Sequence, residues 1–467
     1  MGRIRVALAV ALLTLICAGG ASATRAAHAS TQELTITASD GTKLACGLVL
    51  PPALPAPPGG WPGVILFHGL GQSHKDMETI ANAALAPVGF ASLMCDARGT
   101  GASSGTFGLD GPKEVQDARD LFNWFAARSD VSDTRIGAFG LSLGGGAVWN
   151  AAVAGVPFKA IVSAITWTSL GPALNPNGVP KGGELVRLGQ IVPFARWDPS
   201  LTQARNDLLS GNVSPAVKSI EAARSSRPKL HSLSVPTLLL QGRHDFLFDL
   251  DQALAAYRLL AGPKRLYLGD LGHPPAANPA AELPTYLGLA VGWLGHYLVG
   301  VGSVHGGVVL AHDPWDGSTT SYSALPPARH MIVNLPGSKR ISAAGSATRS
   351  VRPTGGPLET FGDSSVSVRY FGNSALTEIR AMVAVQGGGS PITVGAAKIA
   401  KGSGVVKIPL LDEAVLVPRG KRLVVTVGET PAGGVYLPNQ GGPGNPPVVR
   451  IGRITLNLSV LKRAVSR

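Results

Sequence analysis

The stretch that decides the fold is IGAFGLSLGGGAVW, residues 136–149. Its first part is typical of a buried strand, and Ser142 then stands between Gly140 and Gly144 in the pattern G-x-S-x-G. In this pattern a strand turns sharply into a helix and lifts the serine side chain into the open. Because the chain holds 60 glycines, the pattern alone also fits a purely structural turn. Residues elsewhere must show whether Ser142 is a nucleophile.

A nucleophilic serine needs a histidine to take its proton and a carboxylate to orient that histidine. On the fold that carries this motif, the acid and then the histidine follow in loops after later strands. Asp245 comes just after the apolar run LLLQG, and His273 comes just after the next run, LYLG. We therefore predict a catalytic triad of Ser142, Asp245 and His273.

Neighbouring residues compete for these roles. Asp249 and Asp251 are expected to begin the following helix, where acids interact favourably with the N-terminal dipole. His244 precedes the acid and would break the chain order, and Asp270 is close to the histidine but in the wrong position. A lone histidine after a strand is more often structural. We predict that His273 is catalytic because it follows Ser142 and Asp245 in the expected chain order.

The oxyanion of an acyl-transfer intermediate needs two N–H donors. We expect one from the backbone of Leu143, beside the serine at the start of the helix. We expect the other from Leu70, in the loop that follows His68 and Gly69. His68 itself is expected to shape this loop rather than to act as a base.

From Leu34 onward, short β-rich runs alternate with helical patterns, which is typical of an α/β sheet. The first two runs are expected to pair across an Asp40-Gly41 turn. Helices are expected at about 75–85, from Pro112, and near 283–299. The apolar face predicted for the second helix consists of Val115, Ala118, Leu121, Phe122 and Phe125.

Two intervals depart from this alternation. Residues 166–233 contain no evident strand, which predicts an inserted helical cap over the site. After residue 300, six β-rich runs are separated by Gly, Pro, Ser and Asn turns, which predicts a β-sandwich or jelly roll. We therefore expect an α/β catalytic domain over 30–300 and an all-β domain over 301–467.

The N-terminus predicts export. Arg3 and Arg5 precede an apolar run, and small residues at 21–23 and 27–29 suit a cleavage site, so residues 1–29 read as a signal peptide. The apolar run falls short of the roughly 20 residues that cross a bilayer, so we expect no stable membrane insertion. The expected location is secreted or in the cell envelope.

Composition excludes several classes of function. The 467-residue chain is 45% hydrophobic and only 15% charged, as in folded globular proteins. Its net charge of +13 is scattered, without a basic run or a nucleic-acid motif, so no nucleic-acid partner is expected. No H-E-x-x-H, paired-cysteine or phosphate-loop spacing occurs, so we expect chemistry without a cofactor or metal.

Several segments carry a family resemblance: FHGLGQS, CDARGTGASSG, GAFGLSLGGG, QGRHD and LGH. Together with the cap and the C-terminal run VVKIPLLDEAVLVPRGKRLVVTV, they resemble the X-Pro dipeptidyl-peptidase and cocaine-esterase-like (CocE/NonD) serine hydrolases. The resemblance implies an α/β-hydrolase fold followed by a jelly-roll domain, and hydrolysis through an acyl-enzyme. In CDARGTGASSG, Asp96 and Arg98 are expected to hold loops near the site.

The chain departs from that family in two respects. Members often have tyrosine after the nucleophile and after the HG pair, where this chain has Leu143 and Leu70, which favours backbone donors for the oxyanion. Nor does any acid carry a motif that marks it as the anchor for a substrate amine; the cap offers Glu184, Asp198, Asp207 and Glu221. Cys46 and Cys95 lie on strands that are neighbours in this fold, so they form a disulfide or remain two buried thiols.

The sequence thus predicts a secreted serine hydrolase that cleaves ester or amide bonds, X-Pro dipeptidyl bonds included, in a small ester or peptide substrate. The alternative is a protein that binds surface glycan or envelope polymer and carries a vestigial hydrolase domain. That reading needs aligned exposed aromatic residues in the tail. The Trp and Tyr residues of the tail are few and scattered, which favours packing: Trp315, Tyr322, Tyr370 and Tyr436.

Overall fold

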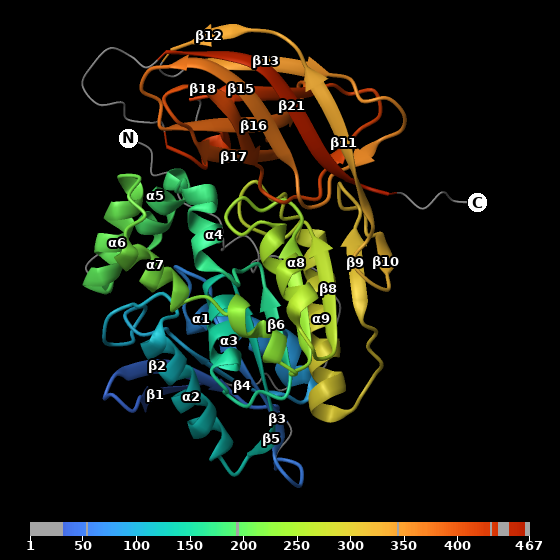
Figure 1. Ribbon diagram of the computed structural model, residues 1–467. Helices are drawn as coiled ribbons and strands as arrows, with labels where there is room; N and C mark the ends of the chain where they lie inside the picture. The colour runs from blue at the N-terminus through green and yellow to red at the C-terminus, as the bar shows by residue number, and fades with distance from the viewer. Residues whose placement is uncertain are drawn as a thin grey trace, which may run out of the picture.

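The computed structural model describes residues 31–52, 55–192, 196–342, 345–429, 432–437 and 448–462. An α/β part with helices on both faces of its sheet carries an all-β part on top (Figure 1). The segment read as a signal peptide, residues 1–29, lies outside the described residues. Over the described part of the chain, no helix is both long enough and apolar enough to cross a membrane.

The central sheet has ten strands in the order β1-β2-β4-β3-β5-β6-β7-β8-β9-β10. The strands from β4 to β9 in this order are parallel, whereas β1, β2 and β10 pair antiparallel. Parallel strands bring their carboxyl ends to one edge, where ligands bind in open α/β sheets. The strands are β1 Thr31–Thr37, β2 Lys43–Val49, β3 Trp61–Phe67, β4 Ala91–Cys95, β5 Val131–Leu141, β6 Ile161–Ala164, β7 Thr237–Gly242, β8 Lys264–Gly269, β9 Gly307–Ala311 and β10 Thr319–Tyr322.

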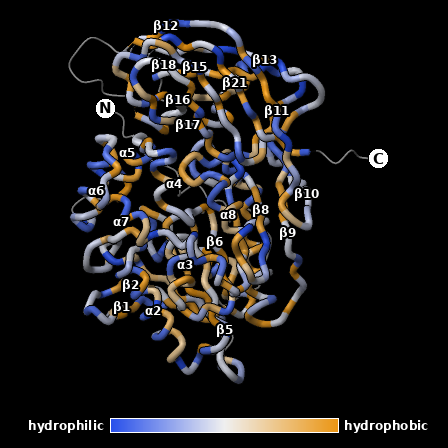
Figure 2. The backbone as a smooth tube through the Cα atoms, viewed as in Figure 1, coloured by the Kyte–Doolittle hydropathy of each residue, from blue (hydrophilic) through white to orange (hydrophobic). Residues whose placement is uncertain are grey.

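Successive residues of a strand face opposite sides of the sheet, so the sheet has two hydrophobic layers. On β3, Ile65 packs with the layer under α2, α3 and α8, whereas Val64 packs with the layer under α1 and α9. Figure 2 shows these apolar segments gathered inside the molecule. The helices are α1 His74–Ile80, α2 Pro112–Ala126, α3 Leu143–Val153, α8 Leu250–Leu259 and α9 Leu283–Leu294.

The face predicted for α2 is partly wrong. Ala118, Leu121, Phe122 and Phe125 are buried as expected, but Val115 is only half-buried. Glu114 and Asp117 are buried instead. They are tolerated inside because each has a partner: the Gly108 N–H donates to Glu114 at 2.5 Å, and the Arg98 guanidinium donates to Asp117 at 2.6 Å.

The helical cap is confirmed. It joins β6 to β7, and its described residues contain helices and no strand of a sheet. The cap lies between the α/β part and the all-β part (Figure 1). Its helices are α4 Leu170–Leu174, α5 Gly182–Ile191, α6 Pro199–Leu209 and α7 Pro215–Ala222, followed by a 3-10 helix, Arg227–Ser232.

The all-β part is a sandwich of two antiparallel sheets, in the orders β11-β21-β15-β18 and β13-β20-β16-β17. All six runs expected after residue 300 form strands. The sequence analysis missed β13, β17 and three short strands, β12 Lys339–Ile341, β14 Leu358–Glu359 and β19 Leu416–Val417. The strand β17 reads TVGAAK, whose small residues are poor strand signals. The strands are β11 Ala328–Leu335, β13 Ser346–Val351, β15 Ser365–Asn373, β16 Glu378–Val385, β17 Thr393–Lys398, β18 Gly402–Pro409, β20 Leu423–Gly428 and β21 Val449–Leu461.

The β-rich, helix-poor sequence begins near residue 300, but the α/β sheet continues beyond this point. β9 and β10 follow residue 300, yet β9 pairs in parallel with β8 and so completes the α/β sheet. The sandwich begins only at β11. Residues 328–462 are called the β-domain below.

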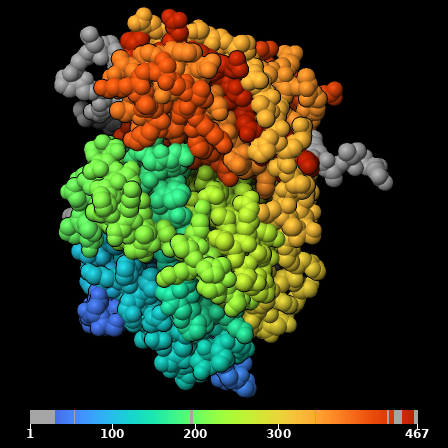
Figure 3. Space-filling model, viewed as in Figure 1, coloured from blue at the N-terminus to red at the C-terminus, as the bar shows by residue number. Residues whose placement is uncertain are grey.

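The β-domain packs directly on the cap and on the α/β part, as Figure 3 shows. The N–H of Gly183, on the cap, donates to the Val435 carbonyl at 2.9 Å. The N–H of Leu250 donates to the Asp412 carbonyl at 2.9 Å. Tyr370 and Tyr436 are 5% and 1% exposed, which agrees with a packing role for these two residues.

Candidate active site

Ser142 stands at the turn between β5 and α3, with φ 52° and ψ −116°, a backbone conformation that non-glycine residues rarely adopt. The turn is tight enough to exclude side chains on both flanking glycines. A Cβ on Gly140 would lie 2.1 Å from the Gly144 carbonyl oxygen, and one on Gly144 would lie 2.0 Å from that of Phe67. The strained turn thus requires the glycines of G-x-S-x-G.

The structure brings the three predicted triad residues together. The Ser142 hydroxyl lies 2.9 Å from His273 Nε2, and His273 Nδ1 lies 2.8 Å from Asp245 Oδ2. The three come from loops after β5, β7 and β8, which lie at the same edge of the parallel sheet. This is the arrangement of a serine nucleophile, its base and the acid that orients the base.

Asp245 is completely buried, and its surroundings favour the carboxylate form. Burial alone would raise its pKa, but the charge and hydrogen bonds of His273, with the Phe248 N–H, outweigh burial, so the pKa lies below its ordinary value. The N–H groups of Leu247 and Phe248 donate to Oδ1 at 3.0 and 2.9 Å. The Phe248 ring packs edge-on against His273, with ring centroids 5.1 Å apart.

The two predicted oxyanion donors lie beside the nucleophile. Leu143 is the first residue of α3, so its N–H has no acceptor inside the helix. Leu70 lies on the loop after β3, and both leucines line the same cavity as Ser142. The placement agrees with two backbone donors, and the roles of Leu70 and Leu143 stay predictions.

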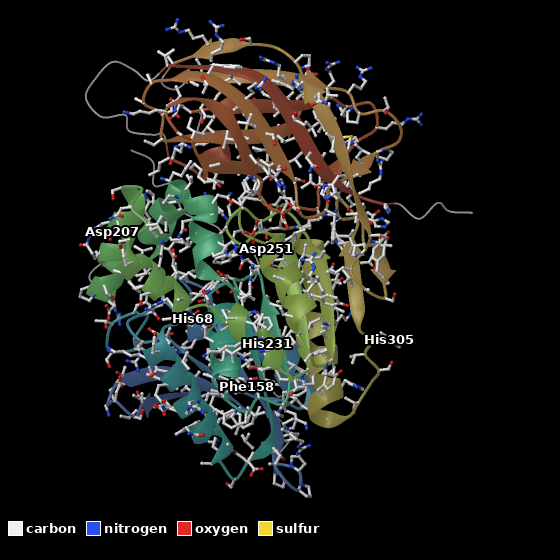
Figure 4. The ribbon with its side chains drawn as sticks, in the orientation of Figure 1. His68, Phe158, Asp207, His231, Asp251 and His305 are labelled. Carbon is white, nitrogen blue, oxygen red and sulfur yellow. A yellow bond between two sulfur atoms is a disulfide. The ribbon has the colours of Figure 1, made fainter. Side chains whose placement is uncertain are left out.

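The loops around the site are held by the residues expected to do so. His68 is buried; its Nδ1 donates to the Gly69 carbonyl at 2.8 Å, and its Nε2 accepts from the Ala97 N–H at 2.9 Å. Burial lowers the pKa of His68, which favours this neutral form. Figure 4 shows His68 beneath the cap. Asp96 accepts hydrogen bonds from the N–H and the ring of His74, both at 2.8 Å.

The four other residues considered for the triad make different contacts in the structure. Asp249 is the N-cap of α8, and Asp251 lies in its first turn, as predicted. The His244 ring contacts the Pro391 carbonyl oxygen at 2.8 Å. Asp270 lies 3.8 Å from the guanidinium of Arg243, away from the role of the triad acid.

The sequence analysis missed three residues that hold the loop of Asp245. Glu413 of the β-domain accepts the Asp245 N–H at 3.1 Å. Lys181 of the cap is fully buried and donates to the carbonyls of Phe246 and Leu247 at 2.9 and 3.1 Å. Arg243 is also fully buried and donates to the Ala414 carbonyl at 2.6 Å. No local signal in the sequence marks these residues, because a charged side chain is fully buried only when it is paired, and here the partners come from distant segments.

Two cavities meet at Ser142. The first, called the cap cavity, has a volume of about 80 Å³ and extends among α4, α5, α6 and α7. The second, called the histidine cavity, has a volume of about 200 Å³ and is lined by His273, Gln72, Glu184 and Arg187. The nucleophile is therefore open to a substrate on two sides.

Cys46 and Cys95 form a disulfide between directly opposed residues of β2 and β4, with 4.0 Å between their Cα atoms. The sequence left open either a disulfide or two buried thiols, and the structure contains the disulfide. The bond lies directly before Asp96, so it ties the outer strands to a loop beside the site.

Part of the chain matches a known family and a curated protein. Residues 40–275, half of the chain, match the family model described as X-Pro dipeptidyl-peptidase (S15 family). An uncharacterized 31.7 kDa protein in the traX-finO intergenic region of Escherichia coli is 36% identical over 108 residues, which is 23% of this chain and 37% of that protein. The match thus spans well under half of the length of that relative.

Solved structures share the whole architecture. An α-amino acid ester hydrolase superposes with a TM-score of 0.71 at 14% identity, over 96% of this chain and 99% of that one. A CocE/NonD family hydrolase from Staphylococcus aureus gives 0.68 at 15% identity, over 91% and 93%. An aminopeptidase from a marine sediment archaeon gives 0.69 at 12% identity, over 96% and 99%. These likenesses show the fold: a mostly parallel α/β sheet with helices, followed by a β-domain.

Proposed function

Because this chain belongs to the X-Pro dipeptidyl-peptidase (S15) family and is a serine hydrolase, we propose that Ser142, His273 and Asp245 hydrolyse carboxylic ester or amide bonds through an acyl-enzyme. The observation that carries the proposal is the unbroken chain of hydrogen bonds from the Ser142 hydroxyl through His273 to Asp245. The two cavities that meet at Ser142 provide room on both sides of a reacting carbonyl.

In the acylation step, Ser142 Oγ attacks the carbonyl carbon while His273 Nε2 takes its proton. The carbonyl oxygen becomes an oxyanion, which the N–H groups of Leu143 and Leu70 stabilise. The bond to the leaving group then breaks, and the proton moves from His273 to the departing oxygen or nitrogen. Asp245 holds His273 in the required tautomer and stabilises the imidazolium.

In the deacylation step, water takes the place of the leaving group. His273 removes one proton from the water, whose oxygen attacks the acyl carbon. The bond to Ser142 Oγ breaks, and His273 returns the proton to the serine. The products are a carboxylic acid and the restored enzyme.

A fluorophosphonate probe, which reacts with activated serines, tests the proposal in parallel with hydrolysis of p-nitrophenyl acetate. We expect wild-type protein to be labelled and active, and Ser142→Ala to lose both properties. Ser210→Ala, which changes an exposed serine of the cap, is the control and should keep both. Folded wild-type protein that is neither labelled nor active, or labelled Ser142→Ala, would contradict the proposal.

We also propose that the protein is exported. The signal-peptide pattern of residues 1–29 supports this, and the Cys46–Cys95 disulfide suits an oxidising compartment. N-terminal sequencing of protein recovered from outside the cytoplasm should begin after Ala23 or Ala29. Recovery of full-length protein beginning at Met1 in the cytoplasm would contradict export.

A further inference from the structure

The position of the histidine determines which cavity takes which half of the substrate. His273 must give its proton to the leaving group, so the leaving group has to lie on the side of His273. His273 lines the histidine cavity together with Ser142. The cap cavity meets Ser142 beside Leu143, one of the expected oxyanion donors. The acyl part of the substrate therefore enters the cap cavity.

The wall of the cap cavity is almost wholly apolar. Every cap helix contributes to it, with Leu174, Leu185, Leu208 and Val217 among the side chains. An apolar wall of this kind gains free energy when it replaces water with hydrocarbon.

Besides Ser142, two polar side chains line the described wall, and both are engaged. Arg205 Nε donates to the Leu185 carbonyl at 3.1 Å. Glu221 Oε1 accepts a hydrogen bond from the Asn175 amide. Burial raises the pKa of Glu221 to about 7, so it is largely uncharged below neutral pH and only about half ionised at pH 7.

The remaining acids of the cap do not reach this cavity. Asp198 caps α6 and accepts the Ser200 N–H at 3.0 Å. Asp207 lies on the outer side of the cap, as Figure 4 shows, and accepts from Gln203 at 2.8 Å. Glu184 lines the histidine cavity and pairs with Arg187 at 2.9 Å. An ammonium group in the cap cavity would therefore lose its hydration without meeting a ready carboxylate.

We infer that the cap cavity selects esters of aliphatic carboxylic acids and rejects acyl parts that carry a free amine. An apolar cavity of about 80 Å³ has room for part of an alkyl chain but not for a chain of any length, so the preferred acyl part is longer than acetate and shorter than palmitate. This inference rests on the proposed function, since it names the substrate class of the same site.

The first test compares p-nitrophenyl esters from acetate to palmitate, and adds a matched pair. Heptanoate and 6-aminohexanoate have the same length and differ only by a terminal methyl or ammonium group. We expect kcat/KM to peak at a chain length between those of acetate and palmitate and heptanoate to exceed 6-aminohexanoate at least about tenfold. A flat chain-length profile overturns the inference. So does a preference for the amino ester that Glu221→Gln abolishes, because Glu221 would then be an amine anchor.

The second test changes the size of the cavity. Ala204 lines it from α6 and is 7% exposed, so Ala204→Leu should fill it and lower the heptanoate-to-acetate ratio of kcat/KM about tenfold. Leu208→Ala should move the optimum to longer chains. Ala222→Leu, at the exposed end of α7, is the matched control and should leave the profile unchanged. Folded Ala204→Leu and Leu208→Ala with the wild-type profile overturn the inference.

Acetate hydrolysis and probe labelling distinguish failure of the inference on the acyl part from failure of the proposed function. Acetate is too short to fill the cap cavity, so its turnover reports the triad alone. If the wild-type protein hydrolyses acetate and labels at Ser142 but shows no chain-length optimum, only the inference on the acyl part fails. If it does neither, the proposed function fails.

Discussion

At the scale of single residues, Asp245 has the most completely defined surroundings in the site. It is fully buried and accepts hydrogen bonds from the ring and N–H of His273 and from the N–H groups of Leu247 and Phe248. Each donor favours the carboxylate and fixes its orientation. Asp245 can therefore hold only one tautomer of His273, the one whose Nε2 faces Ser142.

Asp245→Asn tests this requirement. The amide keeps the shape of the side chain but can donate to His273 Nδ1, which favours the wrong tautomer, so kcat should fall about 10⁴-fold. The measurement is ester hydrolysis, with thermal unfolding to show that the variant is folded. Asp207→Asn, on the outer side of the cap, is the control. A loss below about tenfold would remove Asp245 from the triad.

Glu221 should make the binding of long acyl chains depend on pH. Because burial raises its pKa to about 7, Glu221 is neutral at pH 6 and ionised at pH 8. A charge beside an aliphatic chain is costly, so KM for the heptanoate ester should rise several-fold between these values. The positive charge of Lys218, on the same helix, lowers the pKa of Glu221, but by less than burial raises it. Glu221→Gln should abolish the pH dependence of KM, and an unchanged dependence would assign it to another group.

The same group affects stability with a definite sign. The folded-state pKa lies above the unfolded value of about 4.3, so the folded protein binds more protons between pH 4 and 7. The free energy of unfolding contributed by Glu221 therefore falls as pH rises through this window. Glu221→Gln should accordingly raise Tm more at pH 8 than at pH 5.

At the scale of elements, the junction of β5 and α3 depends on close contacts between backbone segments. Gly144→Ala would place a Cβ 2.0 Å from the Phe67 carbonyl oxygen, so the turn must open. We expect loss of at least about 3 kcal/mol of stability, or failure to fold. Gly288→Ala, on α9 with no atom within 4 Å of the new Cβ, is the control and should stabilise by about 0.4–1 kcal/mol. Chemical denaturation of both variants gives the comparison.

The disulfide between β2 and β4 should contribute to stability through the unfolded chain. Cys46 and Cys95 are 49 residues apart, and a closed loop of this length is worth about 4 kcal/mol in the chain-entropy description. The double variant Cys46→Ala, Cys95→Ala should lose about this amount and should not respond to reducing agents. A wild-type protein whose denaturation midpoint is the same with and without reductant would contradict the prediction.

At the scale of the whole molecule, the β-domain takes part in the site without touching the substrate. Its Glu413 accepts the N–H of Asp245, and its Ala414 carbonyl accepts from the buried Arg243. The loop of the triad acid thus lies between the sheet that carries it and a domain that begins about 80 residues later in the chain. We expect Glu413 to be a positioning residue.

Glu413→Ala should lower kcat about tenfold, because the loop of Asp245 loses an acceptor at its centre. Glu413→Gln retains an oxygen that accepts the N–H and should restore most of the activity. Rescue by glutamine is a readout that lost packing alone would not produce. Glu429→Ala removes another buried acid of the β-domain and is the control. Equal losses in the alanine and glutamine variants would exclude this positioning role.

The sequence by itself predicted the alternation of strands and helices, the inserted cap and the all-β domain that follows, and it predicted that Ser142, His273 and Asp245 form one site. It could do so because hydrophobic period and turn residues are local signals, and because Ser142, Asp245 and His273 each follow a recognisable strand. The buried acids of α2 were missed, since an amphipathic pattern does not reveal that Arg98 and Gly108 supply partners.

Only the tertiary structure decided which side chains surround the reacting carbonyl. Glu413 is 168 residues from Asp245 in the chain, and Lys181 is 65 and 66 residues from Phe246 and Leu247, whose carbonyls it binds. No local sequence pattern reveals contacts between such distant residues. The four cap acids look equivalent in the sequence, yet packing places Glu221 in the cap cavity and Glu184 in the histidine cavity. Local preferences fix the elements, but the substrate meets surfaces that form only when distant elements pack together.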